Sequence, residues 1–230
     1  MKLVRLEKVS RAYGRTFALH RVSTTFESGS ATALLGGNGA GKTTLLNILA
    51  TLDAPTQGEV HYDALSWAQV TRRARRSIGW VGHDPLLYAN LSGAENLTFY
   101  ARMYGLSDIH DLTQGLLERV GMADAHDRLV RDCSRGMVQR LTLARALLHD
   151  PALVLLDEPL TGLDRAGRAD LSKLFDMLRS QGKILILSTH DLATADALCD
   201  RALFLRRGRV AHDTALTSPG DLLSAYEEYA

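Results

Sequence analysis

The chain has 230 residues, of which 46% are hydrophobic and 23% are charged, and its formal net charge at pH 7 is +1. Such a composition is ordinary for a soluble globular protein, and the length allows one domain with a substantial core. The near-zero net charge excludes the strong global field by which many proteins attract nucleic acid or acidic lipid.

Apolar runs and cysteines narrow the class of protein further. The longest apolar runs, such as Ala152–Leu156 and Ile184–Leu187, have the length of buried strands and are far shorter than a membrane span. Charges within residues 1–7 occupy the place where a signal peptide would need an apolar region. Cys133 and Cys199 form neither a CxxC pair nor a disulfide framework. We therefore expect a cytosolic protein whose role at a membrane would depend on a partner.

Strand patterns dominate the first part of the chain. Residues 2–10 alternate apolar and polar side chains with one slip, which predicts a half-exposed strand. A turn at residues 13–15 leads to a second alternating stretch, Ala18–Phe26, so we expect a hairpin. A short buried strand, Ala31–Leu35, precedes a glycine-rich turn, and Lys42–Leu52 then shows helical spacing.

The spacing of apolar residues changes in the middle of the chain. From about Leu91 to Leu148 it is mostly helical, and Gly121 ends one of the expected helices. Buried-strand runs return at Leu153–Leu156, Ile184–Ser188 and Ala202–Leu205, separated by helical patterns such as Ala166–Gln181. We therefore expect an α/β fold with a mainly parallel sheet, covered on both faces, and an inserted helical lobe.

The glycine-rich turn matches the phosphate-loop pattern GxxxxGK[ST] in full. Its glycines let the backbone curl so that N–H groups point at phosphate oxygens, and the following helix presents its positive end to the same anion. Lys42 would reach the β- and γ-phosphates, and the Thr43 hydroxyl would ligate Mg²⁺. The candidate ATP-binding residues are Gly36, Gly37, Asn38, Gly39, Ala40, Gly41, Lys42, Thr43 and Thr44. A turn without a ligand is the alternative, and the strand before and helix after the turn argue against it.

A second candidate site follows the apolar strand Leu153–Leu156, which ends in two acids. Asp157 suits a contact to Mg²⁺ near Thr43, and Glu158 suits a general base that polarises the attacking water. Two solvated acids at a strand end would be the alternative, and the phosphate loop makes that alternative minor.

Three further segments resemble motifs of one family. Residues 133–141, Cys-Ser-Arg-Gly-Met-Val-Gln-Arg-Leu, resemble the LSGGQ-x-QR signature of ABC-transporter ATPase subunits. Residues 160–164 look like the D-loop of that family, and residues 188–191 resemble its switch-histidine segment. Tyr13 stands where the family has an aromatic residue that stacks on adenine. The order and spacing of these motifs agree over nearly the whole chain.

The resemblance implies a P-loop NTPase (RecA-like) with an N-terminal antiparallel β portion. It divides one ABC ATPase domain, 1–230, into a core with the β portion (1–90 and 150–230) and a helical subdomain (91–149). It also implies a head-to-tail dimer that encloses two ATP molecules and binds integral membrane subunits at the cytoplasmic face of the inner membrane. No nucleic acid is expected as a partner.

The same resemblance assigns roles across the dimer interface. Ser134 and Gly136 would contact the γ-phosphate bound by the other subunit, at the N-terminus of the signature helix. His190 would contact the γ-phosphate of its own subunit, and Asp164 would link the two sites. An isolated chain should therefore bind ATP but hydrolyse it poorly.

The chain departs from the family pattern at several positions. Gly37 replaces a common proline, and Cys133, Arg135 and Met137 replace the usual leucine, first glycine and glutamine of the signature. Arg135 either weakens the contact across the interface or adds a cation beside the phosphate. His83 stands where the family normally has the glutamine that senses magnesium and the attacking water, so it is a candidate catalytic and metal-contacting residue.

His83 also points to a subfamily. The segment Trp80–Pro85, Trp-Val-Gly-His-Asp-Pro, followed by Leu91–Tyr100, is similar to the ATP-binding subunit of the haem exporter of cytochrome c maturation. That family also has histidine at this position. The alternative is sequence drift in the ATPase of another exporter.

Two surface features allow alternative interpretations. The basic run Arg72–Arg76 favours a solvated loop or a membrane-facing edge over a nucleic-acid site. The apolar residues around His83 form either core or, by resemblance, the groove that receives a coupling helix of the membrane subunit. They are Leu86, Leu87, Tyr88, Phe99 and Tyr104.

Two other classes of function compete with a transporter ATPase. A soluble ABC protein acting on ribosomes or DNA usually carries two ATPase units or a long coiled coil, and neither is present in this sequence. A regulatory module with a degraded site would explain His83 and Arg135. It would not explain why Lys42, Asp157, Glu158 and His190 are intact.

Overall fold

The computed structural model describes residues 1–69, 75–218 and 220–229. The strands are β1 (Leu3–Tyr13), β2 (Thr16–Glu27), β3 (Ala31–Leu35), β4 (Gln57–Tyr62), β5 (Leu65–Ser66), β6 (Ile78–Val81), β7 (Leu153–Asp157), β8 (Ile184–Ser188), β9 (Arg201–Arg206) and β10 (Arg209–Ala215). The α-helices are α1 (Lys42–Leu49), α3 (Gly93–Tyr104), α4 (Ile109–Arg119), α5 (Arg135–Leu147), α6 (Arg165–Ser180), α7 (Leu192–Leu198) and α8 (Asp221–Tyr229). Short 3₁₀ turns are η1 (Trp67–Gln69), η2 (Ala123–Ala125) and η3 (Val130–Asp132). Residues 72–74 of the basic run lie outside the described residues.

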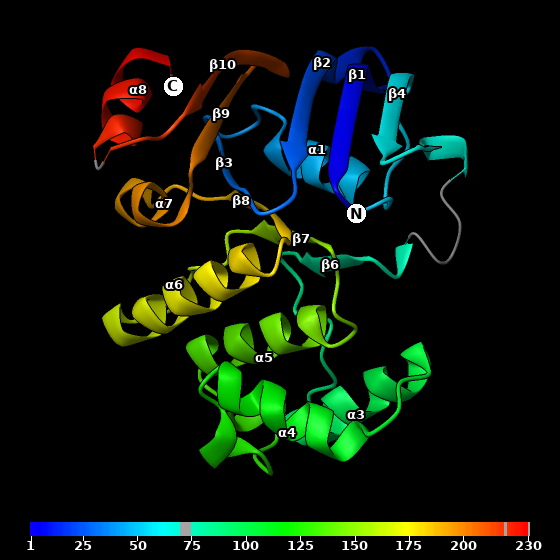
Figure 1. Cartoon of the computed structure of the whole chain (residues 1–230), viewed down its shortest axis with the longest axis vertical. Helices are drawn as coiled ribbons and strands as arrows, with labels where there is room; N and C mark the ends of the chain where they lie inside the picture. Colours follow the sequence, from blue (N-terminus) through cyan, green and yellow to red (C-terminus); the bar gives the residue numbers. More distant parts are fainter. Residues whose placement is uncertain (70–74, 219, 230) are drawn as a thin grey trace.

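Two sheets organise the upper part of the molecule (Figure 1). The larger has the order β10-β9-β3-β8-β7-β6, in which every neighbouring pair is parallel except β10 with β9. The smaller, with the order β2-β1-β4-β5, is antiparallel. The predicted fold class is therefore confirmed, including the antiparallel β portion at the N-terminus.

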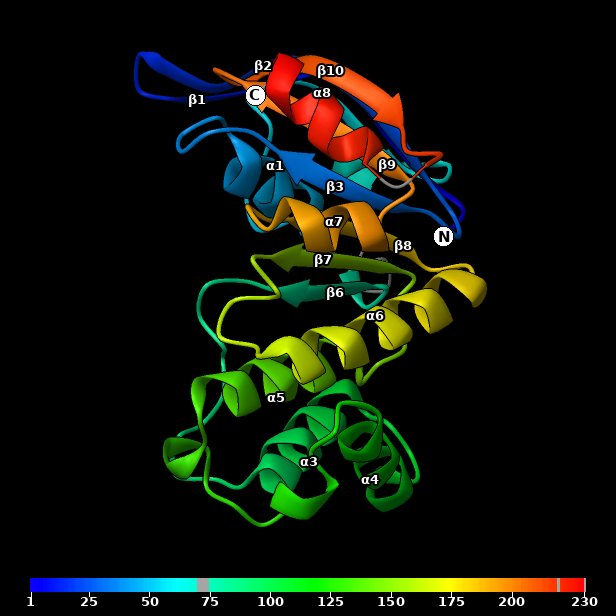
Figure 2. The same cartoon turned by 90° about the vertical axis from the view of Figure 1, so that its left-hand side faces the viewer.

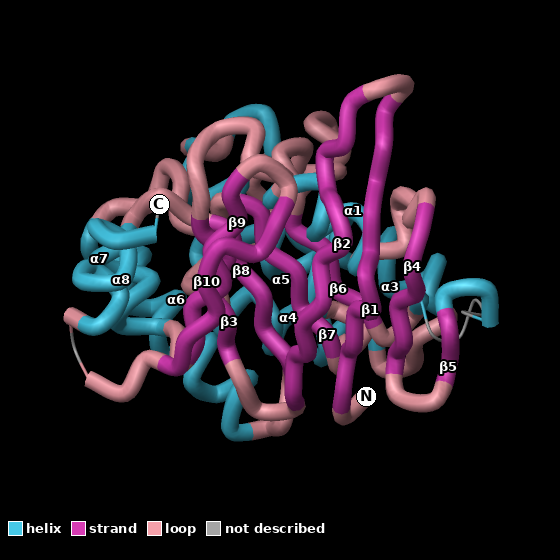
Figure 3. The backbone as a smooth tube through the Cα atoms, turned by 90° about the horizontal axis from the view of Figure 1, so that it is seen from above, coloured by secondary structure: helices cyan, strands magenta, loops and turns pink. Residues whose placement is uncertain are grey.

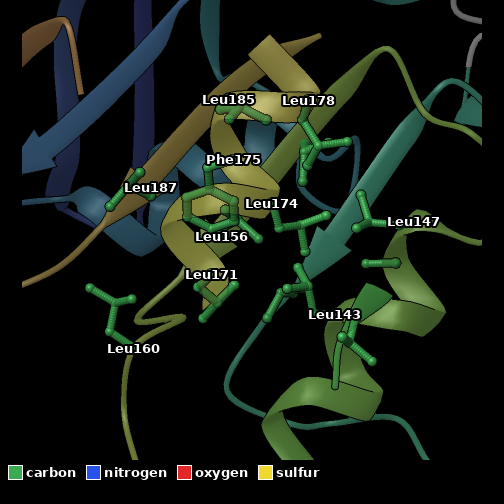
Figure 4. Packing of buried hydrophobic residues seen from close by; sticks show 14 of the residues in the cluster. Leu143, Leu147, Leu156, Leu160, Leu171, Leu174, Phe175, Leu178, Leu185 and Leu187 are labelled. Carbon is green, nitrogen blue, oxygen red and sulfur yellow. The ribbon is translucent and has the colours of Figure 1, made fainter. Parts of the chain in front are cut away.

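The larger sheet is buried on both faces, which explains its continuous apolar runs. Successive side chains of a strand point to opposite faces, so Leu185 and Leu187 belong to one core cluster and Ile184 and Ile186 to the other. The first cluster includes the apolar stripe of α6, with Phe175 fully buried at its centre (Figure 4). The second cluster lies between the larger sheet, α1 and the antiparallel sheet.

The slip in the alternation of residues 2–10 has a structural cause. The pairing of β1 with both neighbouring strands shifts register after residues 6 and 7. Lys8 adopts a left-handed backbone with φ 50°, and the carbonyl oxygens of Glu7 and Lys8 lie where a side chain at Gly58 would begin. This bulge returns Val9 to the buried face, so that Val4, Leu6 and Val9 all reach the core.

The helical lobe lies at the opposite end of the molecule from the antiparallel sheet (Figure 2). Its first helix, α3, begins with a capping box in which Ser92 and Glu95 satisfy each other's backbone N–H groups. Gly121, with φ 67°, follows the end of α4 as predicted. The signature helix α5 begins at Arg135, immediately after its N-cap Ser134.

Other element boundaries also differ from the prediction. Helix α1 ends at Leu49 instead of Leu52, because Thr51 takes a left-handed backbone with φ 61°. Strand β10 and helix α8 were not predicted, since β10 has no fully buried side chain and α8 buries only Leu222. Seen from above, the β1–β2 hairpin projects beyond the neighbouring strand β4 (Figure 3). Within the described residues, no helix combines the length and the apolar character needed to cross a membrane.

Candidate functional site

The phosphate loop connects β3 to α1 through a backbone that only glycine allows at two points. Gly36 has φ 141°, and a β-carbon there would lie 2.2 Å from the carbonyl oxygen of Leu205. Gly41 has φ 108°, and a β-carbon there would lie 2.6 Å from the carbonyl oxygen of Ala18. The loop is therefore wedged between β9 and the start of β2, and this packing fixes its curl.

Lys42 closes over the loop that it follows. Its Nζ donates to the carbonyl oxygens of Gly36 at 2.7 Å and Gly37 at 3.2 Å. The first turn of α1 contains no acidic residue, so the positive end of the helix has no compensating charge there. An anion at the mouth of the loop would meet both the ammonium group and the helix end.

Asp157 connects the phosphate loop to the neighbouring strands. The Thr43 hydroxyl donates to one carboxylate oxygen of Asp157 at 3.1 Å, and the Ser188 hydroxyl donates to the other. Hydroxyl and carboxylate oxygens are the ligands that Mg²⁺ prefers, together with retained waters and substrate phosphates. The residues present therefore fit Mg²⁺, which Thr43 and Asp157 would hold and which would neutralise charge on the phosphates.

Glu158 lies one residue further along, on a strained backbone with φ 53°. Its N–H donates to the carbonyl oxygen of Ser188 at 3.1 Å, and its Oε1 lies 2.9 Å from Nδ1 of His190. Burial raises the pKa of the Glu158 carboxyl, and the charge of Asp157 adds to this, while His190 and Lys42 oppose it. A carboxyl with a raised pKa is better matched to accepting a proton near neutral pH.

These groups surround one hollow. Its lining residues are Ala18, Asn38, Gly39, Ala40, Gly41, Lys42, Thr43, Thr44, His83, Asp157, Glu158 and His190. The fold thus brings His83, Asp157, Glu158 and His190 to the phosphate loop from three separate parts of the sequence. With an anion-binding loop, a suitable Mg²⁺ site and a partly buried carboxylate, this hollow can bind a nucleoside triphosphate and polarise a water molecule.

Other predicted site residues lie elsewhere. Ser134, Gly136 and Asp164 line a second, separate hollow, together with Gly162 and Arg128. Ser134 caps α5 by accepting from the N–H of Met137 at 3.3 Å, and Asp164 caps α6 by accepting from the N–H of Gly167 at 2.8 Å. Tyr13, at the end of β1, is half exposed, and the lining of neither hollow includes it.

One residue that sequence reasoning missed is Ser188, which contacts Asp157 beside the first hollow. It is fully buried, and its side chain contacts both the Asp157 carboxylate and the backbone N–H of Glu158. Its sequence position indicates that it lies near the site, because Ser188 is the first residue of the segment Ser-Thr-His-Asp that resembles the switch motif. Only the pairing of β7 with β8, which sets Asp157 opposite Ser188, gives the hydroxyl its role.

A nucleotide-binding loop at the carboxyl edge of a parallel sheet, with acids on the adjacent strand, places the molecule among P-loop nucleoside triphosphatases. The ABC transporter family model matches residues 19–161, so the chain belongs to that family. It is an ATP-binding subunit of an ABC transporter and hydrolyses ATP.

Curated relatives agree with this family. The ABC transporter ATP-binding protein NatA of Bacillus subtilis is 36% identical over 87% of this chain and 83% of its own length. The lantibiotic transport ATP-binding protein SrtF of Streptococcus pyogenes is 34% identical over 90% and 89%. The Nod factor export ATP-binding protein I of Rhizobium sp. (strain N33) is 37% identical over 89% and 68%.

Solved structures agree as well. An ATP-binding subunit of an ABC transporter has a TM-score of 0.86 at 28% identity, covering 100% of this chain and 95% of its own. The dimeric post-hydrolysis state of the ATP-binding cassette MJ0796, bound to ADP and phosphate, has a TM-score of 0.84 at 26% identity, covering 94% and 99%.

Proposed function

We propose that this chain works as a head-to-tail dimer that binds ATP and Mg²⁺ at its interface and drives an exporter through integral membrane subunits. The observation that carries the proposal is the separation of the two hollows. Lys42 and Glu158 line one, and Ser134 and Gly136 line the other. Two copies arranged head to tail would bring unlike hollows together. MJ0796, a bacterial ABC transporter cassette to which this chain is similar, has been solved as a dimer.

Each residue then has a part in the cycle. Lys42 binds the β- and γ-phosphates, and Thr43 and Asp157 hold Mg²⁺. Glu158 orients and deprotonates the attacking water, while His190 contacts both Glu158 and the γ-phosphate.

The remaining residues act at the edges of the site. His83 lines the same hollow and would approach Mg²⁺ and the attacking water. Tyr13 stacks on the adenine. In the partner copy, Ser134 and Gly136 contact the γ-phosphate at the N-terminus of α5, and Asp164 joins the two sites.

We further propose the haem exporter of cytochrome c maturation as the transporter that this chain drives, from the cytoplasmic face of the inner membrane. The support is the segment Trp80–Pro85, which places His83 where that family has histidine. His83 lines the first hollow, which is called the nucleotide hollow from this point on. A histidine in place of the family's usual glutamine would therefore alter the surroundings of the attacking water.

An exporter of another cargo is the second candidate. It is supported by the relatives, of which one is named for lantibiotic transport and another for Nod factor export. These names describe cargoes that differ from each other, so they support export in general and no single cargo.

The ATPase mechanism is tested by Glu158→Gln. Removing the base while keeping the side chain's shape should leave ATP binding intact, lower turnover by at least about 100-fold and trap a dimer. Turnover would be measured by phosphate release and the dimer by size-exclusion chromatography with ATP. A variant that hydrolyses at the parental rate would refute the role of Glu158.

The cargo is tested by deleting the gene and measuring covalently bound haem in c-type cytochromes of the host. For a haem exporter of cytochrome c maturation we expect their loss, and rescue by the natural chain but not by Glu158→Gln. Unchanged c-type cytochromes would favour the second candidate. Recovery of the chain only with ribosomes, and with no integral membrane protein, would defeat both.

A further inference from the structure

A three-residue cluster outside both hollows holds the ring of Tyr13 in place. The Tyr13 hydroxyl donates to Asp53 Oδ2 at 2.5 Å. Arg11 Nη2 lies 2.6 Å from Asp53 Oδ1, and the Arg11 guanidinium carbon lies 4.7 Å from the centroid of the Tyr13 ring. Asp53 therefore fixes the end of the ring, and Arg11 covers one of its faces.

Asp53 reaches Tyr13 from the segment after α1, the helix that follows the phosphate loop. The N–H of Asp53 donates to the carbonyl oxygen of Asn47 in the last turn of α1, at 3.2 Å. Thr56 strengthens the same junction, because its hydroxyl accepts from the N–H of Ala12 and its N–H donates to Ser10 O at 2.8 Å. The phosphate loop thus precedes α1, and the segment after α1 forms hydrogen bonds with the end of β1.

The position of Tyr13 relative to the nucleotide hollow follows from strand geometry. Ala18 lines that hollow and packs against Gly41. Tyr13 pairs with Thr16, two residues before Ala18, so the backbone of Tyr13 lies about 7 Å further along the hairpin. Tyr13 is 50% exposed although Arg11 covers one face of its ring. A fixed aromatic face at this distance from a phosphate site is suited to stacking on a planar base.

We propose that Asp53 and Arg11 are positioning residues that hold Tyr13 as a preformed stacking platform for the nucleobase. This inference rests on the proposed binding of ATP with its adenine at Tyr13. The side chains of Asp53 and Arg11 are only 20% and 24% exposed, so their ion pair is partly shielded from solvent. A platform that is already ordered loses less conformational freedom when the base binds.

The test compares ADP, which carries the base, with pyrophosphate, which lacks it. In the full-length Asp53→Ala variant we expect the Kd for ADP to rise about 3- to 10-fold and the Kd for pyrophosphate to stay within about two-fold. Both would be measured by isothermal titration calorimetry. Equal weakening of both ligands would overturn the proposal, because it would indicate damage to α1 and the phosphate loop. An unchanged Kd for ADP would overturn it too.

Two further variants separate positioning from general stability. In a Tyr13→Ala background, Asp53→Ala should have no additional effect on the Kd for ADP, whereas additive effects would overturn the proposal. Phe17→Leu is the matched control, since Phe17 is the other exposed aromatic of the hairpin, at 47% exposure. A larger loss for Phe17→Leu than for Tyr13→Ala would overturn it as well. Failure of the natural chain to bind ADP would instead count against the proposed function.

Discussion

At the scale of single residues, the position of Glu158 gives its carboxyl the properties of a base. The left-handed backbone turns the side chain into the hollow, where it contacts His190. Partial burial there raises the pKa of Glu158. The charge of Asp157 raises it further, whereas His190 and Lys42 lower it. The strain is therefore placed at the residue that the chemistry would use.

The first prediction concerns the pH dependence of turnover. Glu158 can accept a proton only as carboxylate, so turnover should fall as the pH drops through its raised pKa. The acid limb of the pH–rate profile should lie above the range of an ordinary glutamate. In His190→Gln, which removes an influence that lowers the Glu158 pKa, the limb should move to higher pH as the overall rate falls. A limb that stays in place would contradict the coupling of the two residues.

The second prediction concerns Arg135. This exposed arginine occupies the first turn of α5, where a positive charge opposes the helix dipole by about 0.3–1 kcal/mol, and no acid in that turn balances it. We expect this cost to be offset in the dimer, where the Arg135 guanidinium would lie beside the γ-phosphate bound by the partner. Arg135→Ala in a Glu158→Gln background should then weaken the ATP-dependent dimer and reduce its salt sensitivity. Size-exclusion chromatography at two salt concentrations measures both effects. Arg102→Ala, on α3, is the matched control. A dimer that becomes stronger would show that Arg135 hinders closure.

At the scale of elements, α5 connects the two hollows within one chain. Its N-cap Ser134 lines the second hollow, and near its other end Arg145 donates to the carbonyl oxygen of Trp80 at 2.7 Å. His149, just past the helix, contacts the carbonyl oxygen of Ile78. Both carbonyls belong to β6, which leads to His83. These hydrogen bonds therefore connect the signature helix to the strand that leads to His83, a residue of the nucleotide hollow.

The third prediction concerns Asn96, which orders the loop between β6 and α3. Asn96 is fully buried; its Oδ1 accepts from the N–H of Tyr88 at 2.8 Å, and its Nδ2 donates to the carbonyl oxygens of Ser92 at 2.9 Å and Tyr88 at 3.1 Å. Asn96→Ala leaves the Tyr88 N–H without a partner and takes one of two donors from the carbonyl oxygens of Ser92 and Tyr88, which keep the backbone N–H groups of Asn96 and Leu91. It should therefore lower the free energy of unfolding by about 1–3 kcal/mol in urea denaturation. The exposed neighbour Asn90→Ala should change it by less than about 0.5 kcal/mol. Equal effects would show that the loop is held by other contacts.

At the scale of the whole molecule, the residues of the predicted site are divided between two separate hollows. One chain holds the loop, the acids and His190 in one hollow and the signature and Asp164 in another. Neither hollow contains the residues of the other. In the proposed head-to-tail dimer a second chain would complete the set, and a two-fold arrangement would complete two sites at once.

The fourth prediction tests this arrangement by mixing two inactive variants. Lys42→Ala disables the phosphate loop, and Ser134→Asp keeps a good N-cap for α5 while setting a negative charge against the γ-phosphate. Each variant alone should be inactive. In a mixed head-to-tail dimer, one site combines the natural Lys42 of one chain with the natural Ser134 of the other, so the mixture should recover a substantial fraction of phosphate release. No recovery would contradict a site shared between chains.

Much of this protein is determined locally by its sequence. The phosphate loop Gly36–Thr43 is a contiguous motif, because neighbouring N–H groups and the following helix supply nearly everything that a phosphate needs. The pair Asp157–Glu158 could be located for a similar reason, since an apolar strand that ends in two acids sets them at the edge of a sheet. Buried strands and amphipathic helices followed from the periodicity of apolar residues.

Other features were decided only by tertiary structure. The bulge at Lys8 depends on packing against Gly58, and the role of Ser188 depends on the register of β8 against β7. The separation of Ser134 from Lys42 depends on how the helical lobe joins the core. Tyr13 and Asp53 lie 40 residues apart in the chain and meet only because α1 returns to the hairpin. Periodicity and motifs describe what neighbouring residues do, whereas these contacts depend on which distant segments pack together.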